Sequence, residues 1–167
     1  MSLLMKVRET KKMRSKFLQQ VVPKVLAYPQ VMTVGTPVTS EYIAHVDTNG
    51  ALGLMRSACI HFQSGITSSG TTTITPTIEE SDDHSTWVAV VLKTGQTLPT
   101  ITPTGSVKDD DYFFLDVSRL KKYFHVIFTP TGTGAAYSSF AAEVTLGDGS
   151  IEWLPRGTTP PVIYSKA

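Results

Sequence analysis

The chain has 167 residues, a length typical of one domain with a substantial hydrophobic core. Hydrophobic residues make up 41% of the sequence and the mean hydropathy is zero, which argues against a membrane-embedded protein and against a wholly disordered one. Serine and threonine are abundant, and ten prolines and twelve glycines are spread through the chain. This composition is typical of an all-β protein.

The net charge of +1 conceals a separation of charge along the chain. Residues 1–24, which we call the basic segment, carry seven basic residues and one acidic residue, a net charge of +6. Residues 25–167 carry eight basic and thirteen acidic residues, a net charge of −5. The basic segment is therefore expected to seek an acidic surface, a nucleic acid or a neighbouring acidic copy of the chain.

Apolar residues are interspersed among the basic ones. Met13, Phe17 and Val21 are four residues apart, which fits a short amphipathic helix that ends before Pro23. A helix of that length is marginal in isolation, so an extended form is equally compatible, and we expect the segment to order against a partner. A frayed terminus is the alternative interpretation. The residues expected to bind the partner are Lys6, Arg8, Lys11, Lys12, Met13, Arg14, Lys16, Phe17 and Leu18.

Neither a membrane anchor nor a disulfide is expected. The start, Met-Ser-Leu-Leu-Met-Lys, lacks the apolar stretch of a secretory signal peptide, and no apolar run is long enough to span a membrane. Cys59 is the only cysteine and lies in an apparent strand, which favours a buried thiol that packs as a small apolar residue over a nucleophile.

We divide the chain into a basic N-terminal arm and linker (1–38), a β-sandwich domain (39–150) and an extended, proline-containing tail (151–167). Runs rich in β-formers, separated by turn residues, predict about eight strands, with 93–108 at best a weak edge strand. Such a pattern predicts two packed sheets, in a jelly roll or a related Greek-key fold. The confident strands are 41–47, 51–63, 71–80, 87–92, 112–117, 120–129 and 137–146.

The stretch 71–92 predicts a β-hairpin around which the domain is organised. Thr71, Thr73 and Thr75 alternate with apolar residues, so this strand should bury one face. The return run, 87–92, is almost continuously apolar and suits a strand packed on both faces or shielded by a neighbour. The tip favours turn chemistry over a calcium or catalytic site, because short carboxylates accept bonds from turn amides. Its structural residues are Ser81, Asp82, Asp83 and Trp87.

No catalytic or metal-binding pattern is apparent. Asp109, Asp110 and Asp111 are adjacent, which favours a solvated turn over a calcium site. The four histidines are dispersed and form neither a His-x-His pair nor a helical zinc pair. No nucleophile elbow or phosphate loop is present. We therefore expect no cofactor, no metal and no enzymatic activity.

Three stretches together resemble small head proteins of tailed bacteriophages. They are Asp47-Thr48-Asn49-Gly50-Ala51-Leu52, the run from Thr77 to Trp87, and Lys122-Tyr123-Phe124-His125-Val126-Ile127-Phe128-Thr129 with Gly132-Thr133. The proteins they resemble are capsid decoration or cement proteins with a β-sandwich, often jelly-roll, body. The resemblance covers roughly residues 42–146. The family often has glycine at the hairpin tip, where this chain has His84.

The resemblance implies a structural virion protein on the outer surface of the capsid, made in the host cytoplasm. Its partners would be the major capsid protein and neighbouring copies of itself in a dimer or trimer, with no membrane partner. The acidic body argues against nucleic acid as the partner. The alternative function is a receptor- or carbohydrate-binding β-module of a phage tail fibre or baseplate, which shares the threonine-rich strand texture.

Overall fold

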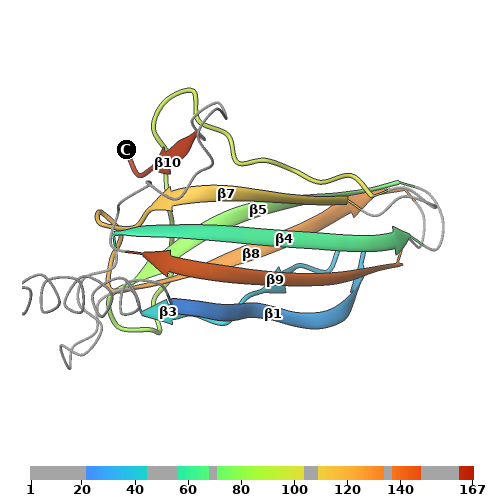
Figure 1. The fold of residues 1–167 in the computed structure, drawn as a ribbon, viewed down its shortest axis with the longest axis horizontal. Coiled ribbons are helices and arrows are strands. Elements are labelled where there is room, and N and C mark those ends of the chain that lie inside the picture. The colour runs from blue at the N-terminus through green and yellow to red at the C-terminus, as the bar shows by residue number, and fades with distance from the viewer. Residues whose placement is uncertain (1–21, 45–55, 68–70, 104–108, 134–136, 148–161) are drawn as a thin grey trace, which may run out of the picture.

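The computed structural model describes residues 22–44, 56–67, 71–103, 109–133, 137–147 and 162–167, which form strands and no helix (Figure 1). Among these residues there is accordingly no helix that could cross a membrane. The strands are β1 (Val22–Thr33), β2 (Val38–Thr39), β3 (Ile43–Ala44), β4 (Ser57–Thr67), β5 (Thr72–Ser81), β6 (Val88–Ala89), β7 (Asp109–Asp116), β8 (Tyr123–Gly132), β9 (Tyr137–Gly147) and β10 (Ile163–Ser165).

The strands form two sheets that pack face to face. The front sheet, which faces the viewer in Figure 1, has the order β1-β9-β4-β7-β10, and the back sheet has the order β2-β8-β5-β6, with β3 also paired to β8. Since β2 and β3 occupy the same side of β8, the orders β1-β9-β4-β7 and β2/β3-β8-β5-β6 are those of a jelly roll. The predicted two-sheet sandwich is confirmed.

The core lies between the two sheets and follows from the alternation of the sequence. In β5, Thr72, Ile74, Pro76 and Ile78 point inward, and the intervening residues are more exposed, as predicted. In β8, the inward residues are Phe124, Val126 and Phe128. The ring of Phe128 lies between Phe62 of β4 and Phe140 of β9, at centroid distances of 5.4 and 4.8 Å, so aromatic packing joins the sheets.

Two strands of the front sheet lie in stretches that the sequence assigns to the arm and linker and to the tail. β1 lies within residues 1–38 and β10 within residues 151–167. β1 tolerates Pro23 and Pro29 because it is an edge strand, and its register with β9 shifts between Val25 and Gln30. β10 adds to β7 in parallel.

The return run of the hairpin corrects the prediction for 87–92. Only Val88 and Ala89 are in a strand, β6, which lies at the edge of the back sheet and pairs with Glu80 and Glu79 of β5. Val88 is 49% exposed and Val91 is 70% exposed. The run is therefore not packed on both faces. Within it, Val90 and Leu92 are partly buried and pack against the core.

Several predicted boundaries are also corrected. Asp109, Asp110 and Asp111, predicted as a turn, begin β7, because they pair with Ser64, Gln63 and Phe62 of β4. In the same way β8 extends to Gly132, through a stretch predicted as a turn. Of 41–47, only Ile43–Ala44 is in a described strand, and 45–47 lie outside the described residues, as do 51–55 of the predicted strand 51–63.

Candidate functional site

The partner-binding residues expected in the basic segment lie outside the described residues. They are Lys6, Arg8, Lys11, Lys12, Met13, Arg14, Lys16, Phe17 and Leu18. The described chain begins at Val22, the first residue of β1, which pairs with Leu146 at the end of β9. The last three residues of the basic segment, 22–24, therefore belong to an edge strand of the front sheet.

The hairpin tip is held by Asp83. Its Oδ1 accepts hydrogen bonds from the backbone N–H groups of Ser85 and Thr86 at 2.9 and 2.8 Å and from the Ser81 hydroxyl at 2.9 Å. Oδ2 accepts a bond from the Thr86 hydroxyl at 3.2 Å. The backbone bonds from Thr86 and Ser85, followed by the side-chain bonds, hold the pKa of Asp83 well below its ordinary value. The carboxylate is thus used to form the turn.

His84 adopts a left-handed backbone conformation, with φ of +69°, at the position where the resembling family often has glycine. Such a conformation is costly for a residue with a Cβ atom. The His84 ring lies 3.5 Å from the ring of Tyr42 and 4.8 Å from that of Tyr123, centroid to centroid. These ring contacts offset the backbone strain and attach the tip to β8 and to the segment between β2 and β3.

Trp87 and His125 extend this aromatic cluster over the outer face of the back sheet. Their rings are stacked, with centroids 3.9 Å apart and planes 16° apart. His125 is buried, and its Nε2 lies 2.9 Å from Glu79 Oε2 on the neighbouring strand. Lys121 Nζ lies 3.2 Å from Asp82, so the charged groups near the hairpin have partners within the molecule.

A buried carboxylate, that of Glu80, ties the C-terminal residues to the body. Only 3% of Glu80 is exposed, and its Oε1 lies 2.5 Å from Lys166 Nζ. Its Oε2 accepts a bond from the backbone N–H of Lys121 at 3.0 Å. The residues after β6 complete this attachment, because the Gln96 side chain bonds to the Ile163 carbonyl and to the Ser165 N–H of β10.

The outer face of the front sheet is different, because two of its carboxylates, Asp110 and Glu143, share a single partner among the described residues. Asp110 and Glu143, whose side chains are 65% and 64% exposed, lie on either side of His61. His61 Nε2 is 3.6 Å from Asp110 Oδ2, and His61 Nδ1 is 3.3 Å from Glu143 Oε1. One imidazole carries at most one positive charge, so it cannot neutralise both carboxylates.

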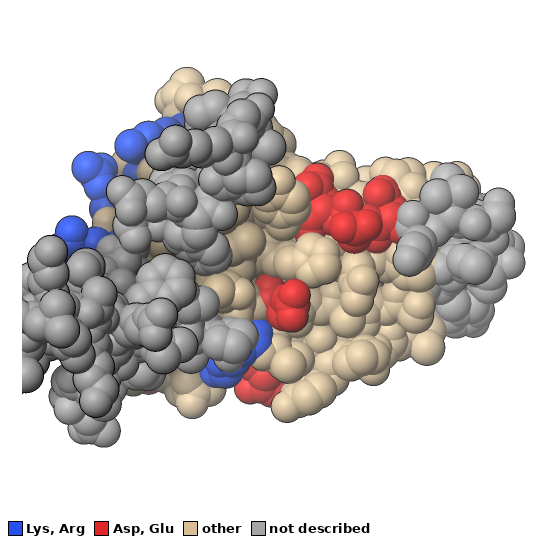
Figure 2. All heavy atoms as spheres, viewed as in Figure 1, with Lys and Arg blue, Asp and Glu red and all other residues tan. Residues whose placement is uncertain are grey.

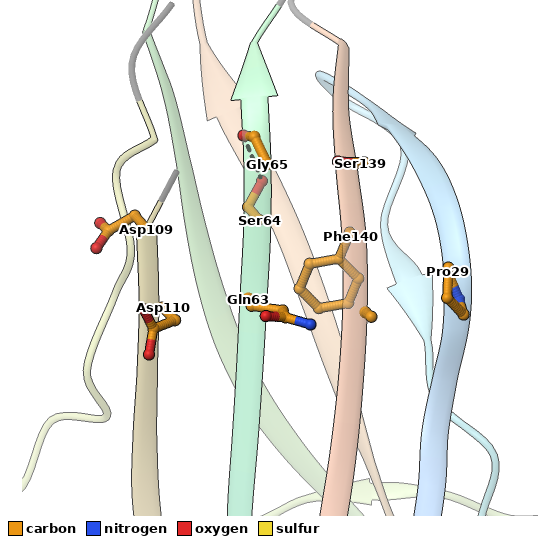
Figure 3. Close-up of a pocket in the computed structure, with 9 residues that line it drawn as sticks. Pro29, Gln63, Ser64, Gly65, Asp109, Asp110, Ser139 and Phe140 are labelled. Carbon is orange, nitrogen blue, oxygen red and sulfur yellow. Dashed lines mark hydrogen bonds between the residues drawn. The ribbon is translucent and has the colours of Figure 1, made fainter. Parts of the chain in front are cut away.

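Two adjoining hollows, of about 290 and 180 Å3, cross this face between β1 and β7. They share Pro29, Gln63 and Ala141, and together we call them the front groove. Figure 3 shows Asp109 and Asp110 on one side of the larger hollow and Pro29 on the other, with Gln63 between them. The larger hollow adds Asp109, Asp110 and Ser139, and the smaller adds Val25, His61 and Glu143.

The floor of the groove depends on a close approach of β4 and β9. A Cβ atom at Gly65 would come within 2.1 Å of the Ser139 hydroxyl oxygen, so only glycine fits there without displacing Ser139. The register of β4 and β9 shifts between Ser64 and Thr67, at this same place. Gly65 lies between the predicted strands 51–63 and 71–80, but in the structure it belongs to β4 and lines the floor of the groove.

The groove is acidic because three of the four strands around it, β4, β7 and β9, contain no cations, and the Nζ of Lys24 in β1 donates a hydrogen bond to the Tyr42 carbonyl instead. β7 contains Asp109, Asp110, Asp111 and Asp116, β9 contains Glu143, and no lysine or arginine occurs in β4, β7, β9 or β10. In the described part of the chain, no lysine or arginine is within 4.0 Å of any of these carboxylates. Figure 2 shows acidic spheres gathered over β7, while the basic spheres lie mostly at the opposite end of the face.

The described residues offer little for catalysis. No group of three or more histidine, cysteine, aspartate or glutamate side chains in them is arranged to hold a metal ion. Cys59 is half-buried on the outer side of β4, which corrects the expectation of a core thiol. Burial, and secondarily the charge of Glu143, raise the pKa of this thiol, which favours the thiol over the reactive thiolate.

Sequence reasoning missed the front groove. His61 and Gln63 alternate with Ile60 and Phe62 along one strand. Because Ile60 and Phe62 are buried, His61 and Gln63 must face outward, and the sequence pattern could have shown this. Their proximity to Asp110 and Glu143 depends on strand register across β9, β4 and β7, between residues as far apart in sequence as His61 and Glu143. Local patterns carry no signal for such a register.

No protein-family model matches the sequence, and no curated protein matches it. Solved structures with a similar fold include the PBSX exported protein XepA, with a TM-score of 0.45 and 15% identity over 85% of this chain. The CBM22-1 xylan-binding domain of Paenibacillus barcinonensis Xyn10C has a TM-score of 0.44 and 10% identity; the match covers 77% of this chain and 95% of that domain. A chain of infectious bursal disease virus, Gx strain, has a TM-score of 0.41 and 15% identity over 79% of this chain.

The chain spans 42% of the XepA chain and 33% of the infectious bursal disease virus chain. At such TM-scores and identities, the likenesses carry no argument about the function of this chain.

Proposed function

We propose that this chain is a structural virion protein, and more narrowly a capsid decoration protein that binds the outside of a tailed-phage head and staples neighbouring major capsid subunits. The observation that carries the proposal is the separation of charge between the basic segment, at +6, and the acidic surface of strands β4, β7 and β9 of the front sheet, which contain no lysine or arginine. Opposite charges on separate parts of one chain favour contacts between molecules in a lattice.

The basic segment supplies the contact. Lys11, Lys12, Arg14 and Lys16 provide charge for an acidic capsid or neighbouring-copy surface, and Met13, Phe17 and Leu18 provide apolar anchors. A segment that orders on assembly loses chain entropy but covers a wide surface. Many weak contacts on one lattice then add through avidity, so that each copy needs only modest affinity.

The body supports the same role. The jelly roll has a continuous aromatic core, and its hairpin tip and C-terminal residues are held by internal bonds through Asp83 and Glu80. A rigid body of this kind keeps its shape when load is applied between neighbours. Under this proposal, the protein acts as a spacer and staple and performs no catalytic chemistry.

The test is binding of the purified full chain to phage heads that lack it, scored by co-sedimentation and by survival of the heads on heating. We expect saturable binding and improved survival. A variant with Lys11→Glu, Lys12→Glu and Arg14→Glu should lose most binding, whereas a control of equal charge change, Arg56→Glu, Lys93→Glu and Arg119→Glu, should retain it. Absence of binding by a folded wild-type chain would overturn the proposal.

A second candidate, a carbohydrate-binding module, is favoured by one specific observation. Tyr112, paired with His61 across β4 and β7, has an exposed ring beside a groove that carries the planar polar groups of Gln63, Asp110 and Glu143. Aromatic faces and planar polar groups are suited to sugar rings. A glycan array with the full chain separates the candidates: a specific signal that Tyr112→Ala abolishes, without head binding, favours this one.

A further inference from the structure

We propose that the front groove is the docking site for the basic segment of a second copy of this chain. The inference deepens the proposed function and rests on it in one respect, the role of the basic segment in assembly. It assigns the neighbouring-copy surface to a particular place on the molecule. Three observations carry it: the charge of the groove, the distribution of apolar groups along it, and the position at which β1 begins.

The charge of the groove is complementary to that of the segment. Asp110 and Glu143 are both about two-thirds exposed, and their shared partner among the described residues is a single imidazole, that of His61. Asp109 borders the same hollow. Nearby lysines or arginines would neutralise such a face, but β4, β7 and β9 contain none, and Lys24 of β1 donates its Nζ hydrogen bond to the Tyr42 carbonyl. A cationic peptide therefore gains attraction along the whole groove.

The two sides of the groove differ, and the segment carries both kinds of group. The β7 side is acidic, whereas the β1 side presents Val25 and Val31, which are 43% and 66% exposed. Val25 lines the smaller hollow, and Val31 is in register with Ser139, which lines the larger one. A segment in which Met13, Phe17 and Leu18 are interspersed with lysine and arginine can place apolar groups against β1 and cations against β7.

The direction of the chain favours a neighbour over the molecule's own groove. The acidic end of the groove is level with Phe140, whereas the basic segment joins β1 at Val22, level with Leu146. To return to its own groove, the segment would have to reverse immediately before β1. The residues immediately before β1, 16–21, include no glycine, proline, asparagine, aspartate or serine, the residues that dominate tight turns. Fully extended, residues 1–21 span up to roughly 70 Å, enough to reach an adjacent copy.

The experiment is a charge exchange measured by sedimentation velocity on the full chain. One variant reverses the groove, Asp110→Lys with Glu143→Lys, and another reverses the segment, Lys11→Glu with Lys12→Glu. Each alone should weaken self-association by about tenfold or more, because attraction becomes repulsion at several pairs. An equimolar mixture of the two should regain association, because each variant supplies the complement that the other lacks.

The control reverses two exposed acids away from the groove, Glu41→Lys with Asp82→Lys, and should leave association close to that of the wild type. Circular dichroism and thermal melts establish that all variants are folded. A wild-type chain that stays monomeric, a mixture that fails to regain association, or a control as weak as the groove variant each overturns the inference. Head binding is measured separately. If the groove variant fails the association test, by associating as the wild type does, but still binds heads normally, the docking inference is refuted and the proposal of a decoration protein stands.

Discussion

The outer faces of the two sheets use their charged residues in opposite ways. On the back sheet and its hairpin, charges are satisfied within the molecule: Glu79 contacts His125, Asp82 contacts Lys121, and Asp83 holds the turn. On the front sheet, Asp110 and Glu143 share one histidine and are otherwise exposed to solvent. The same fold thus stabilises itself with the charges of one face and leaves those of the other available to a partner. Substitutions on the two faces and in the core between them test this contrast.

The largest effect should come from the interior that both faces share. Phe128→Ala removes a fully buried ring that contacts Phe62 and Phe140, and we expect a loss of about 3–5 kcal/mol in the free energy of unfolding. Urea denaturation measures it. Phe114→Ala, at a half-exposed ring on the outer side of β7, is the matched control and should cost clearly less. Equal losses would contradict the assignment of the core.

The next effect should come from the buried ion pair of the back sheet. Lys166→Ala leaves the Glu80 carboxylate buried without its cation, and we expect a loss of about 3 kcal/mol. Glu80→Gln should cost less, about 1–2 kcal/mol, because the amide still accepts the Lys121 bond and the released Lys166 can reach water. Denaturation of both variants tests the order, and a larger loss for Glu80→Gln would refute it.

A smaller effect is expected at the hairpin tip, where backbone strain and ring contacts oppose each other. His84→Ala loses the contacts with Tyr42 and Tyr123 but keeps the left-handed φ, whereas His84→Gly loses the contacts and relieves the strain. The glycine variant should therefore be more stable than the alanine variant by about 1 kcal/mol. Paired thermal melts decide the matter, and an alanine variant at least as stable would show that the φ is not strained.

The smallest effect on stability is expected at the front groove. Asp110→Asn and Glu143→Gln should each change the free energy of unfolding by less than about 0.5 kcal/mol, because exposed pairs contribute little. A loss of more than about 1 kcal/mol in urea denaturation would mean that these carboxylates stabilise the fold, as those of the hairpin do. The contrast between the faces would then disappear.

The elements that could be predicted from the sequence are those in which the signal is local. The alternation of Thr73, Ile74 and Thr75 predicts which face of β5 is buried, because a strand has a period of two. The two-sheet class follows from the number of such runs and their turns.

The elements that could not be predicted depend on neighbours distant in sequence. Asp109 to Asp111 form a strand because β4 continues beside them, and nothing in three adjacent aspartates indicates this. The run 87–92 is apolar, yet Val88 and Val91 are exposed because the run lies at a sheet edge. The candidate site was the hardest part to predict, because the front groove joins four strands whose order is fixed only by the whole topology.

The junction between the basic segment and β1 has a mechanical consequence. A force on the segment enters the body at Val22 and acts along β1, whose antiparallel ladder with β9 runs from Val22 and Leu146 to Thr33 and Tyr137. Its hydrogen bonds are perpendicular to the strands. Such a pull shears many bonds together, whereas a pull across the ladder would unzip them one after another. A molecule tethered through this segment would resist extension with the combined strength of the strand pair.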